Sequence, residues 1–371
     1  MMKKLPFSFF DILVDGVDVW FVHNTLPVLI HGNITSDVYH IETVLPLAWG
    51  NGFAAYGCVK RYLNTIIIAP KSTPWLLLYD IETKNIEKIE VDYKCMVGLG
   101  TYNLFDKMYI VDKHAYLIPG RYPSIVKLDL ETRQLEYIEV CSSSWLESLN
   151  RNKFLFYNSI LLDRHIYAPC YQTGDMMKFS IDSEDYELMP YINGASLIAV
   201  AESKRGLICA CKNKTLMVGK DTIKLPSDFD SNINFLVVYG DNVYVIPING
   251  KAIFYYNMVQ CKWTELVKLH KEYNALSRKN REYGADFWSV HCANNSIFLS
   301  SNHEGTLMVI DMISNEVISK TLELPLDDLN MLFQSEPADI VNETRQNSLQ
   351  NYIKKIAYFA ELRRYVFEGE D

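Results

Sequence analysis

Short apolar segments of five residues recur along the chain, and each is followed within a few residues by a polar or turn-forming residue. A run of this length, bounded by turn residues, is typical of a buried β-strand. The segments end 36 to 54 residues apart, and self-similarity at a period of about 20 to 50 residues indicates a repeat architecture. The segments are residues 19–23, 66–70, 115–119, 165–169, 207–211, 243–247 and 297–301.

The repeat unit reads as four strands. Its clearest copy contains four strand-like runs separated by short polar breaks: residues 53–59, 65–70, 75–80 and 86–91. The third run ends in Tyr-Asp-Ile-Glu-Thr at 79–83, and the next copy has Leu-Asp-Leu-Glu-Thr at 128–132. An Asp at this position bonds the backbone of the following residues and favours a turn. Each unit is therefore predicted to be an antiparallel four-stranded meander.

Seven copies of the unit can be placed, although the first and fifth are poorly formed and six or eight remain possible. A single four-stranded sheet cannot bury both faces, whereas sheets arranged radially bury one another and leave only short edges. The sequence therefore predicts an all-β fold, a β-propeller of seven four-stranded blades. The copies lie near residues 7–46, 51–92, 99–140, 153–192, 195–226, 233–268 and 285–325.

The repeats resemble those of Kelch-like and related propellers over about residues 7–325. The resemblance rests on the aliphatic second strand, the Tyr-Asp-x-x-Thr turn and an apolar or aromatic fourth strand such as residues 261–266. The double Gly of Kelch repeats is absent. The resemblance thus implies the architecture alone, because propellers carry many unrelated functions.

The pattern changes after Pro325. Apolar residues from Leu349 to Ala360 recur at helical spacing, which predicts a C-terminal amphipathic helix. We expect a propeller at residues 1–326 and a helical extension at residues 327–371, which packs on the propeller or docks elsewhere.

Composition excludes several classes of partner. The chain has 36 Lys and Arg against 45 Asp and Glu, a net charge of −9, with no basic block for nucleic acid. No stretch approaches the roughly 18 apolar residues that span a bilayer. Its 8 Cys are scattered through apolar stretches and read as reduced thiols. We expect a cytoplasmic protein without nucleic-acid or membrane partners.

A propeller gathers the ends of its second strands, and the loops between blades, on one face. Lys71, Arg121 and Lys212 make that predicted face locally basic, which suits a carboxylate, a phosphate or an acidic sugar. Aromatic residues beside polar ones also suit a sugar-like ligand or a peptide. The predicted ligand-binding residues are Lys71, Arg121, Tyr122, Tyr171, Gln172, Lys212, Asn249, Asn302, His303, Glu304, Trp49 and Trp288.

No local signature of catalysis or metal binding is present. The chain has no Gly-x-Ser-x-Gly, no phosphate-binding loop and no zinc-type Cys or His pairs. We predict no cofactor and no metal site. Candidates for acid or base chemistry at the channel are His23, His303, Asp286 and Tyr171.

Two functions remain open from the sequence. The first is a non-catalytic propeller that presents a polar, locally basic loop face to a protein, a peptide or a small anionic ligand. The alternative is a lyase, epimerase or hydrolase acting on a carbohydrate or amino-acid-like substrate at the central channel. The second requires the four catalytic candidates to converge on one cavity.

Overall fold

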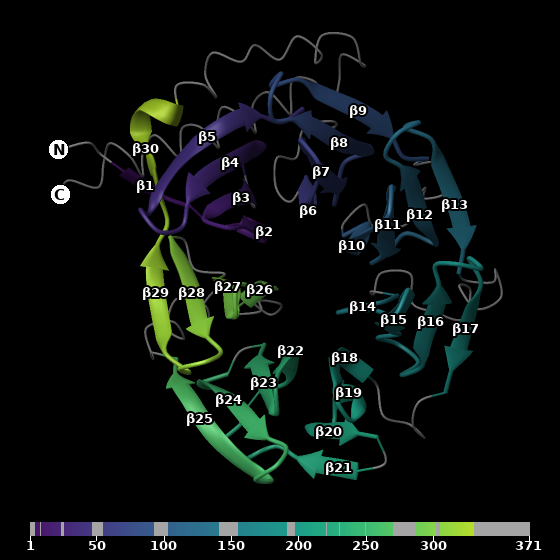
Figure 1. Ribbon diagram of the computed structural model, residues 1–371, viewed down its shortest axis with the longest axis vertical. Helices are drawn as coiled ribbons and strands as arrows, with labels where there is room; N and C mark the ends of the chain where they lie inside the picture. The colour runs from purple at the N-terminus through teal and green to yellow at the C-terminus, as the bar shows by residue number, and fades with distance from the viewer. Residues whose placement is uncertain are drawn as a thin grey trace, which may run out of the picture.

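Seven four-stranded antiparallel sheets form a ring around a central axis in the computed structural model (Figure 1). The chain is therefore a seven-bladed β-propeller, as the sequence predicts. The structure describes residues 4–7, 9–23, 26–46, 55–92, 103–140, 155–190, 197–219, 221–229, 231–248, 250–269, 287–301 and 305–329.

The strands of each blade follow one another in sequence, from the innermost strand beside the axis to the outermost. Blade 1 comprises β2 (Phe9–Asp15), β3 (Asp18–His23), β4 (Val28–Asn33) and β5 (Val38–Val44). Blade 2 comprises β6 (Tyr56–Tyr62), β7 (Thr65–Pro70), β8 (Trp75–Asp80) and β9 (Ile86–Glu90). Blade 3 comprises β10 (Phe105–Val111), β11 (His114–Pro119), β12 (Ser124–Asp129) and β13 (Leu135–Glu139).

Blades 4 to 7 repeat this order. Blade 4 comprises β14 (Ile160–Leu162), β15 (His165–Pro169), β16 (Met176–Ser180) and β17 (Tyr186–Met189). Blade 5 comprises β18 (Leu197–Ser203), β19 (Gly206–Cys211), β20 (Thr215–Val218) and β21 (Asp221–Lys224). Blade 6 comprises β22 (Ile233–Tyr239), β23 (Asn242–Pro247), β24 (Ala252–Asn257) and β25 (Lys262–Lys268). Blade 7 comprises β26 (Phe287–Ala293), β27 (Ser296–Ser301), β28 (Thr306–Asp311) and β29 (Val317–Thr321).

The recurring apolar segments are the second strands of the seven blades. Ile66, Ile67 and Ile68 in β7 are fully buried, because both faces of a second strand pack against neighbouring blades. Outermost strands instead consist of partly buried and exposed positions, as in β9 and β13. This difference explains why the second strand gives the strongest sequence signal.

The turn that leaves the third strand is built as predicted. Asp80 Oδ1 accepts hydrogen bonds from the backbone of Glu82 at 3.0 Å and of Thr83 at 2.7 Å, and a third from the Thr83 hydroxyl. Asp129 and Asp311 make the same backbone contacts in blades 3 and 7. These bonds lower the pKa of all three carboxyl groups, since they stabilise the charged form.

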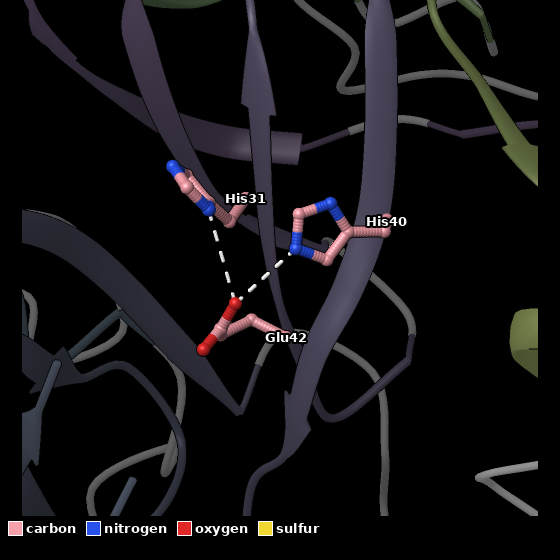
Figure 2. A group of neighbouring side chains, drawn as sticks. All are labelled: His31, His40 and Glu42. Carbon is pink, nitrogen blue, oxygen red and sulfur yellow. Dashed lines mark hydrogen bonds and ion pairs between the residues drawn. The ribbon is translucent and has the colours of Figure 1, made fainter. Parts of the chain in front are cut away.

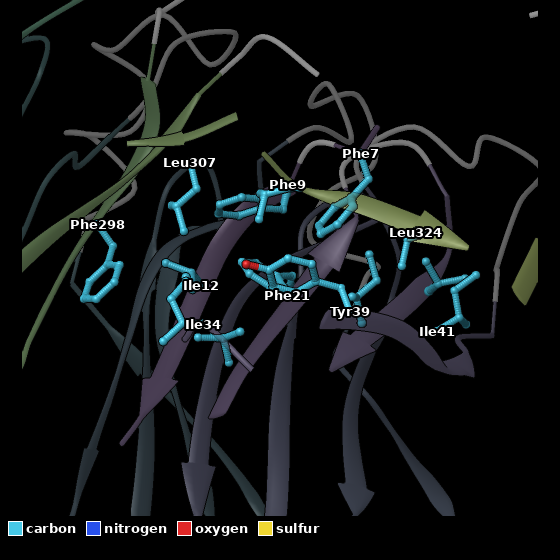
Figure 3. Close-up of a cluster of buried hydrophobic side chains, with 14 of the residues drawn as sticks. Phe7, Phe9, Ile12, Phe21, Ile34, Tyr39, Ile41, Phe298, Leu307 and Leu324 are labelled. Atoms are coloured by element: carbon cyan, nitrogen blue, oxygen red, sulfur yellow. The ribbon is translucent and has the colours of Figure 1, made fainter. Parts of the chain in front are cut away.

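The hydrophobic core is divided among the interfaces between blades. The described residues form seven buried clusters, and each draws its members from two adjacent blades. One such cluster joins blades 7 and 1. Figure 3 shows it, with the side chains of Phe7, Phe9, Phe21 and Tyr39 packed together. The ring is thus held mainly by apolar packing between sheets.

Residues from both ends of the described chain close this ring. Strand β1 (Lys4–Pro6) pairs with β30 (Glu323–Pro325), and the Phe7 amide donates to the Leu322 carbonyl at 3.2 Å. The short 3-10 helix η2 (Leu326–Leu329) follows, and Asp328 Oδ2 accepts from the Ile41 amide of β5 at 3.0 Å. The predicted helix at residues 349–360 lies outside the described residues. Within the part that is described, no helix has the length and apolar character to span a membrane.

Candidate functional site

The loop face combines the ends of second strands with the starts of innermost strands. In blades 1, 2, 3 and 5 to 7 the first residue of the innermost strand pairs with the last residue of the second, as in Tyr56↔Pro70 and Phe105↔Pro119. Residues just beyond a second strand therefore lie on the same face of the ring as the starts of the innermost strands, and we call this part of the face, beside the central axis, the channel mouth. Lys71 and Arg121 occupy this position in blades 2 and 3.

The side chain of Lys71 folds inward to the innermost strands. Its Cδ lies 3.5 Å from the position that a Cβ on Gly57 would take, so it runs across the bare backbone of β6. Its ammonium group stands 3.4 Å from the ring centroid of Phe10 in β2, which is a cation–π contact. The glycine thus lets Lys71 reach from blade 2 to blade 1 at the channel mouth.

Ionisable groups of both signs surround Lys71. Burial lowers the pKa of its ammonium group to about 8, although the negative charges of Asp106 and Asp11 act in the opposite direction. Burial also raises the pKa of Asp106, against the charges of Lys107 and Lys71 and a 2.8 Å hydrogen bond from the Asn158 amide. These groups interact in a poorly solvated region, where electrostatic effects are stronger than in water.

Polar side chains also cross the axis. Lys107 of blade 3 places its ammonium group 5.7 Å from the ring centroid of Phe235 in blade 6. Asn158 of blade 4 donates to the Ile198 carbonyl of blade 5 at 3.2 Å and to the Asn234 carbonyl of blade 6. Asn234 in turn donates to the Phe287 carbonyl of blade 7 at 2.8 Å. Side-chain hydrogen bonds therefore join the inner parts of blades 4, 5, 6 and 7. A separate contact across the axis joins blade 3 to blade 6.

Arg121 and Tyr122 follow the second strand of blade 3. Arg121 is half-buried, and burial lowers the pKa of its guanidinium group. Tyr122 is 1% exposed and donates its hydroxyl to the Asp92 carbonyl at 2.8 Å. Its ring packs against Phe105 at 5.1 Å, so Tyr122 is part of the core between blades 2 and 3.

Tyr171 and Lys212 follow the second strands of blades 4 and 5 and contact each other. The Lys212 ammonium lies 3.7 Å from the Tyr171 ring centroid and donates to the Tyr171 carbonyl at 3.1 Å. Gln172 is half-buried beside them in sequence. The loop face thus carries a second cation–π pair, which bridges blades 4 and 5.

His23 ends the second strand of blade 1 and is buried there. Its Nδ1 accepts a hydrogen bond from the Leu26 amide at 3.0 Å, and its ring lies 6.3 Å from that of Phe7. Burial lowers its pKa to about 3, so the imidazole is neutral and serves as an acceptor. The catalytic candidates His23 and Tyr171 therefore belong to separate blades and separate contact networks.

The other predicted site residues lie outside the description: Trp49, Asn249, Asp286, Asn302, His303 and Glu304, together with the side chain of Trp288. In contrast, Asp106, Lys107 and Asn158 were not predicted from the sequence. A usable signal was present, because two charged residues interrupt an otherwise apolar innermost strand at 106 and 107.

The described residues also contain one group with the geometry for a metal ion. It consists of His31, His40 and Glu42 on the outer strands β4 and β5 of blade 1 (Figure 2). Their ligand atoms all lie within 4.8 Å of one another.

Comparison with known proteins supports the architecture. No protein-family model matches the chain, and no curated protein matches its sequence. Among solved structures, a streptogramin B lyase is similar with a TM-score of 0.59 and 9% identity, over 82% of this chain and 95% of that one. Virginiamycin B lyase from Staphylococcus aureus gives a TM-score of 0.56 and 10% identity, over 81% and 96% of the two chains. The computationally designed protein Ika8 gives a TM-score of 0.54 and 10% identity, over 85% and 87%. At these identities the likeness shows the fold alone.

Proposed function

We propose that this propeller is a binding protein that takes an anionic group, a carboxylate or a phosphate, at the loop-face mouth of its channel. Lys71 anchors the ligand. The observation that carries this proposal is the inward course of Lys71, whose ammonium group is held against Phe10 where the innermost strands begin.

The charge balance at the mouth supports an anionic ligand. Lys60, Lys71 and Lys107 face Asp11 and Asp106, and burial raises the pKa of Asp106. Burial holds the neighbouring His291 neutral, with its pKa lowered to about 4. Among the described residues named here, three lysines therefore stand against two carboxyl groups, although the whole chain is acidic. In a poorly solvated site one charge-assisted hydrogen bond contributes about 1.5 to 3 kcal/mol.

The ligand is either a small molecule or the acidic group of a protein or peptide partner. The cation–π pair of Lys212 and Tyr171 gives the same face a second basic and aromatic position. Interaction with a partner protein, the resemblance of the repeats to Kelch-like ones and a cytoplasmic location stay predictions from the sequence.

A titration with anionic probes tests the proposal. Binding of inorganic phosphate, citrate and an acidic peptide is measured by calorimetry for the full chain and for Lys71→Met. The variant keeps the apolar stem and removes the charge, and we expect affinity to fall about 10-fold to 100-fold, the size of one charged hydrogen bond.

Lys88→Met is the matched control. Lys88 also lies over an aromatic ring, 4.7 Å from the Trp75 centroid, but on the outermost strand of blade 2. We expect Lys88→Met to bind the anionic probes with the same affinity as the unmodified chain. Equal affinity of the unmodified chain and Lys71→Met for every probe would contradict the proposal.

An enzymatic function is the second candidate, and one observation favours it. Lys71 has a pKa lowered to about 8, and the nearby Asp106 has a raised pKa; opposed shifts of this kind suit a base and an acid. Two structural neighbours are lyases by name. In this case Asp106→Asn abolishes turnover of a carbohydrate or amino-acid-like substrate and leaves its binding intact.

A further inference from the structure

The outer strands of blade 1 hold a cluster of metal-ligating side chains far from the channel. His31 of β4 and His40 of β5 are a directly opposed pair in the sheet register. Glu42 lies two residues beyond His40, and side chains two apart on a strand share a face. Sheet geometry therefore brings two imidazoles and one carboxylate together, as Figure 2 shows.

The three ligand atoms are already close to a metal-binding arrangement. Glu42 Oε2 lies 3.3 Å from His40 Nε2 and 3.8 Å from His31 Nδ1. Around a tetrahedral ion with bonds of about 2.0 to 2.2 Å, ligand atoms stand roughly 3.3 to 3.6 Å apart. All three ligand atoms lie within 4.8 Å of one another, so side-chain rotations that bring the two imidazoles closer would place them on one ion.

Surrounding residues hold the ligands in position. The His31 ring is stacked on Trp20, with centroids 4.0 Å apart and an interplanar angle of 14°. The Asp18 carboxylate lies 3.6 Å from His31 Nε2, the nitrogen on the opposite side of the ring from the site. A carboxylate at this outer nitrogen favours the tautomer whose Nδ1 lone pair faces the metal.

The carboxylate of Glu42 is fixed in the same way. Its side chain is 7% exposed, and its Oε1 is bonded by the hydroxyl of Tyr79 and the ammonium group of Lys84, both from blade 2. These contacts leave Oε2 directed at the two imidazoles. The His31 and His40 side chains are 27% and 47% exposed, so an ion can reach them from solution.

We propose that His31, His40 and Glu42 bind a divalent zinc-type metal ion, with water as its fourth ligand. Two imidazoles and one carboxylate suit Zn²⁺ and its first-row neighbours, whereas Ca²⁺ and Mg²⁺ prefer sites made of oxygen atoms alone. The ion would tie β4 to β5 beside the interface with blade 2. This site is independent of the anion site at the channel mouth.

Metal titration of the purified, tag-free full chain tests the proposal. After chelator treatment, ZnCl₂ binding is measured by calorimetry and CoCl₂ binding by visible absorption, which reports four-coordinate geometry. His31→Gln, His40→Gln and Glu42→Gln should each weaken binding more than about tenfold, because loss of even an outer-shell partner commonly costs that much. The His31→Gln/His40→Gln double variant should bind one equivalent fewer.

His114→Gln is the control. His114 stands 3.4 Å from the Asp129 carboxylate, so it is also a His–carboxylate pair, but no second imidazole of the described residues completes a metal-binding group with it. It should bind zinc as the unmodified chain does. Melting temperatures without metal confirm that each variant is folded. The proposal is overturned if the double variant matches the unmodified chain in zinc stoichiometry and affinity, or if His114→Gln loses as much affinity as His40→Gln.

Discussion

The hydroxyl of Tyr157 donates a 2.8 Å hydrogen bond to Oδ1 of Asn234, and this bond joins blade 4 to blade 6 past the intervening blade 5. Tyr157 lies just before the three-residue strand β14; its amide donates to the Pro169 carbonyl at 3.2 Å, and its side chain extends to blade 6. Asn158, from the same segment, donates to the Ile198 carbonyl of blade 5 and to the Asn234 carbonyl of blade 6. Side-chain hydrogen bonds, as well as packing between the sheets, therefore connect the inner parts of these blades.

Loss of this inner network should destabilise the fold. Asn234 is 1% exposed, and its substitution by Ala leaves the Tyr157 hydroxyl and the Phe287 carbonyl without their partner. We expect Asn234→Ala to lower the free energy of unfolding by about 1 to 3 kcal/mol. Urea denaturation followed by circular dichroism measures the change. The exposed Asn213→Ala serves as the control, and equal stability of the two variants would show that the network adds nothing.

Phe7 should be essential to ring closure. It is fully buried in the cluster between blades 7 and 1, with its ring 5.5 Å from Phe21 and 5.8 Å from Tyr39. We expect Phe7→Ala to cost about 3 to 5 kcal/mol, because it removes a large apolar side chain and leaves a cavity. Thermal denaturation measures this loss. Val17→Ala, at a 50% exposed turn position, should stay within about 0.5 kcal/mol of the unmodified chain.

Anion binding should weaken as the pH rises through the pKa of Lys71. The ammonium group has a pKa lowered to about 8 by burial, so the cation that attracts the ligand is present below that pH and lost above it. Calorimetry between about pH 6 and pH 10 measures the fall, and a bound anion moves the midpoint upward because it stabilises the cation. Lys71→Arg should bind at all these pH values, since Arg stays charged. A pH profile unchanged between Lys and Arg would be evidence against this role.

His23 should make the protein sensitive to acid. Its pKa is lowered from 6.5 to about 3 by burial, so the unfolded chain binds a proton that the folded chain rejects. The stability that this group contributes is complete above about pH 6.5 and is lost as the pH falls towards 3. His23→Asn keeps an acceptor for the Leu26 amide and removes the titration, so its acid unfolding midpoint should be lower. His165→Asn, at a partly exposed position, serves as the control, and an identical midpoint for His23→Asn and the unmodified chain would refute the prediction.

Much of this fold could be predicted from the sequence, because it depends on interactions between residues close together in the chain. Buried second strands are apolar on both faces, so their residues stand out wherever the tertiary structure places them. The Asp80 and Asp129 turns depend only on bonds to the next three residues. Because such features are set within a few positions of the chain, the sequence determined the repeat and the face on which strand ends collect, whereas the structure decided the count of seven blades.

The contacts that define the two proposed sites depend on distant residues, and only the tertiary structure decided them. Lys71 reaches the channel because Gly57 leaves room and Phe10 lies in the next blade. His31 and His40, nine positions apart, meet through the register of one hairpin, while the orienting contacts from Tyr79 and Lys84 come from another blade. A sequence pattern reports which face of a strand is buried. Which side chain crosses to which neighbour depends on packing between sheets, and so it appears only once the ring has closed.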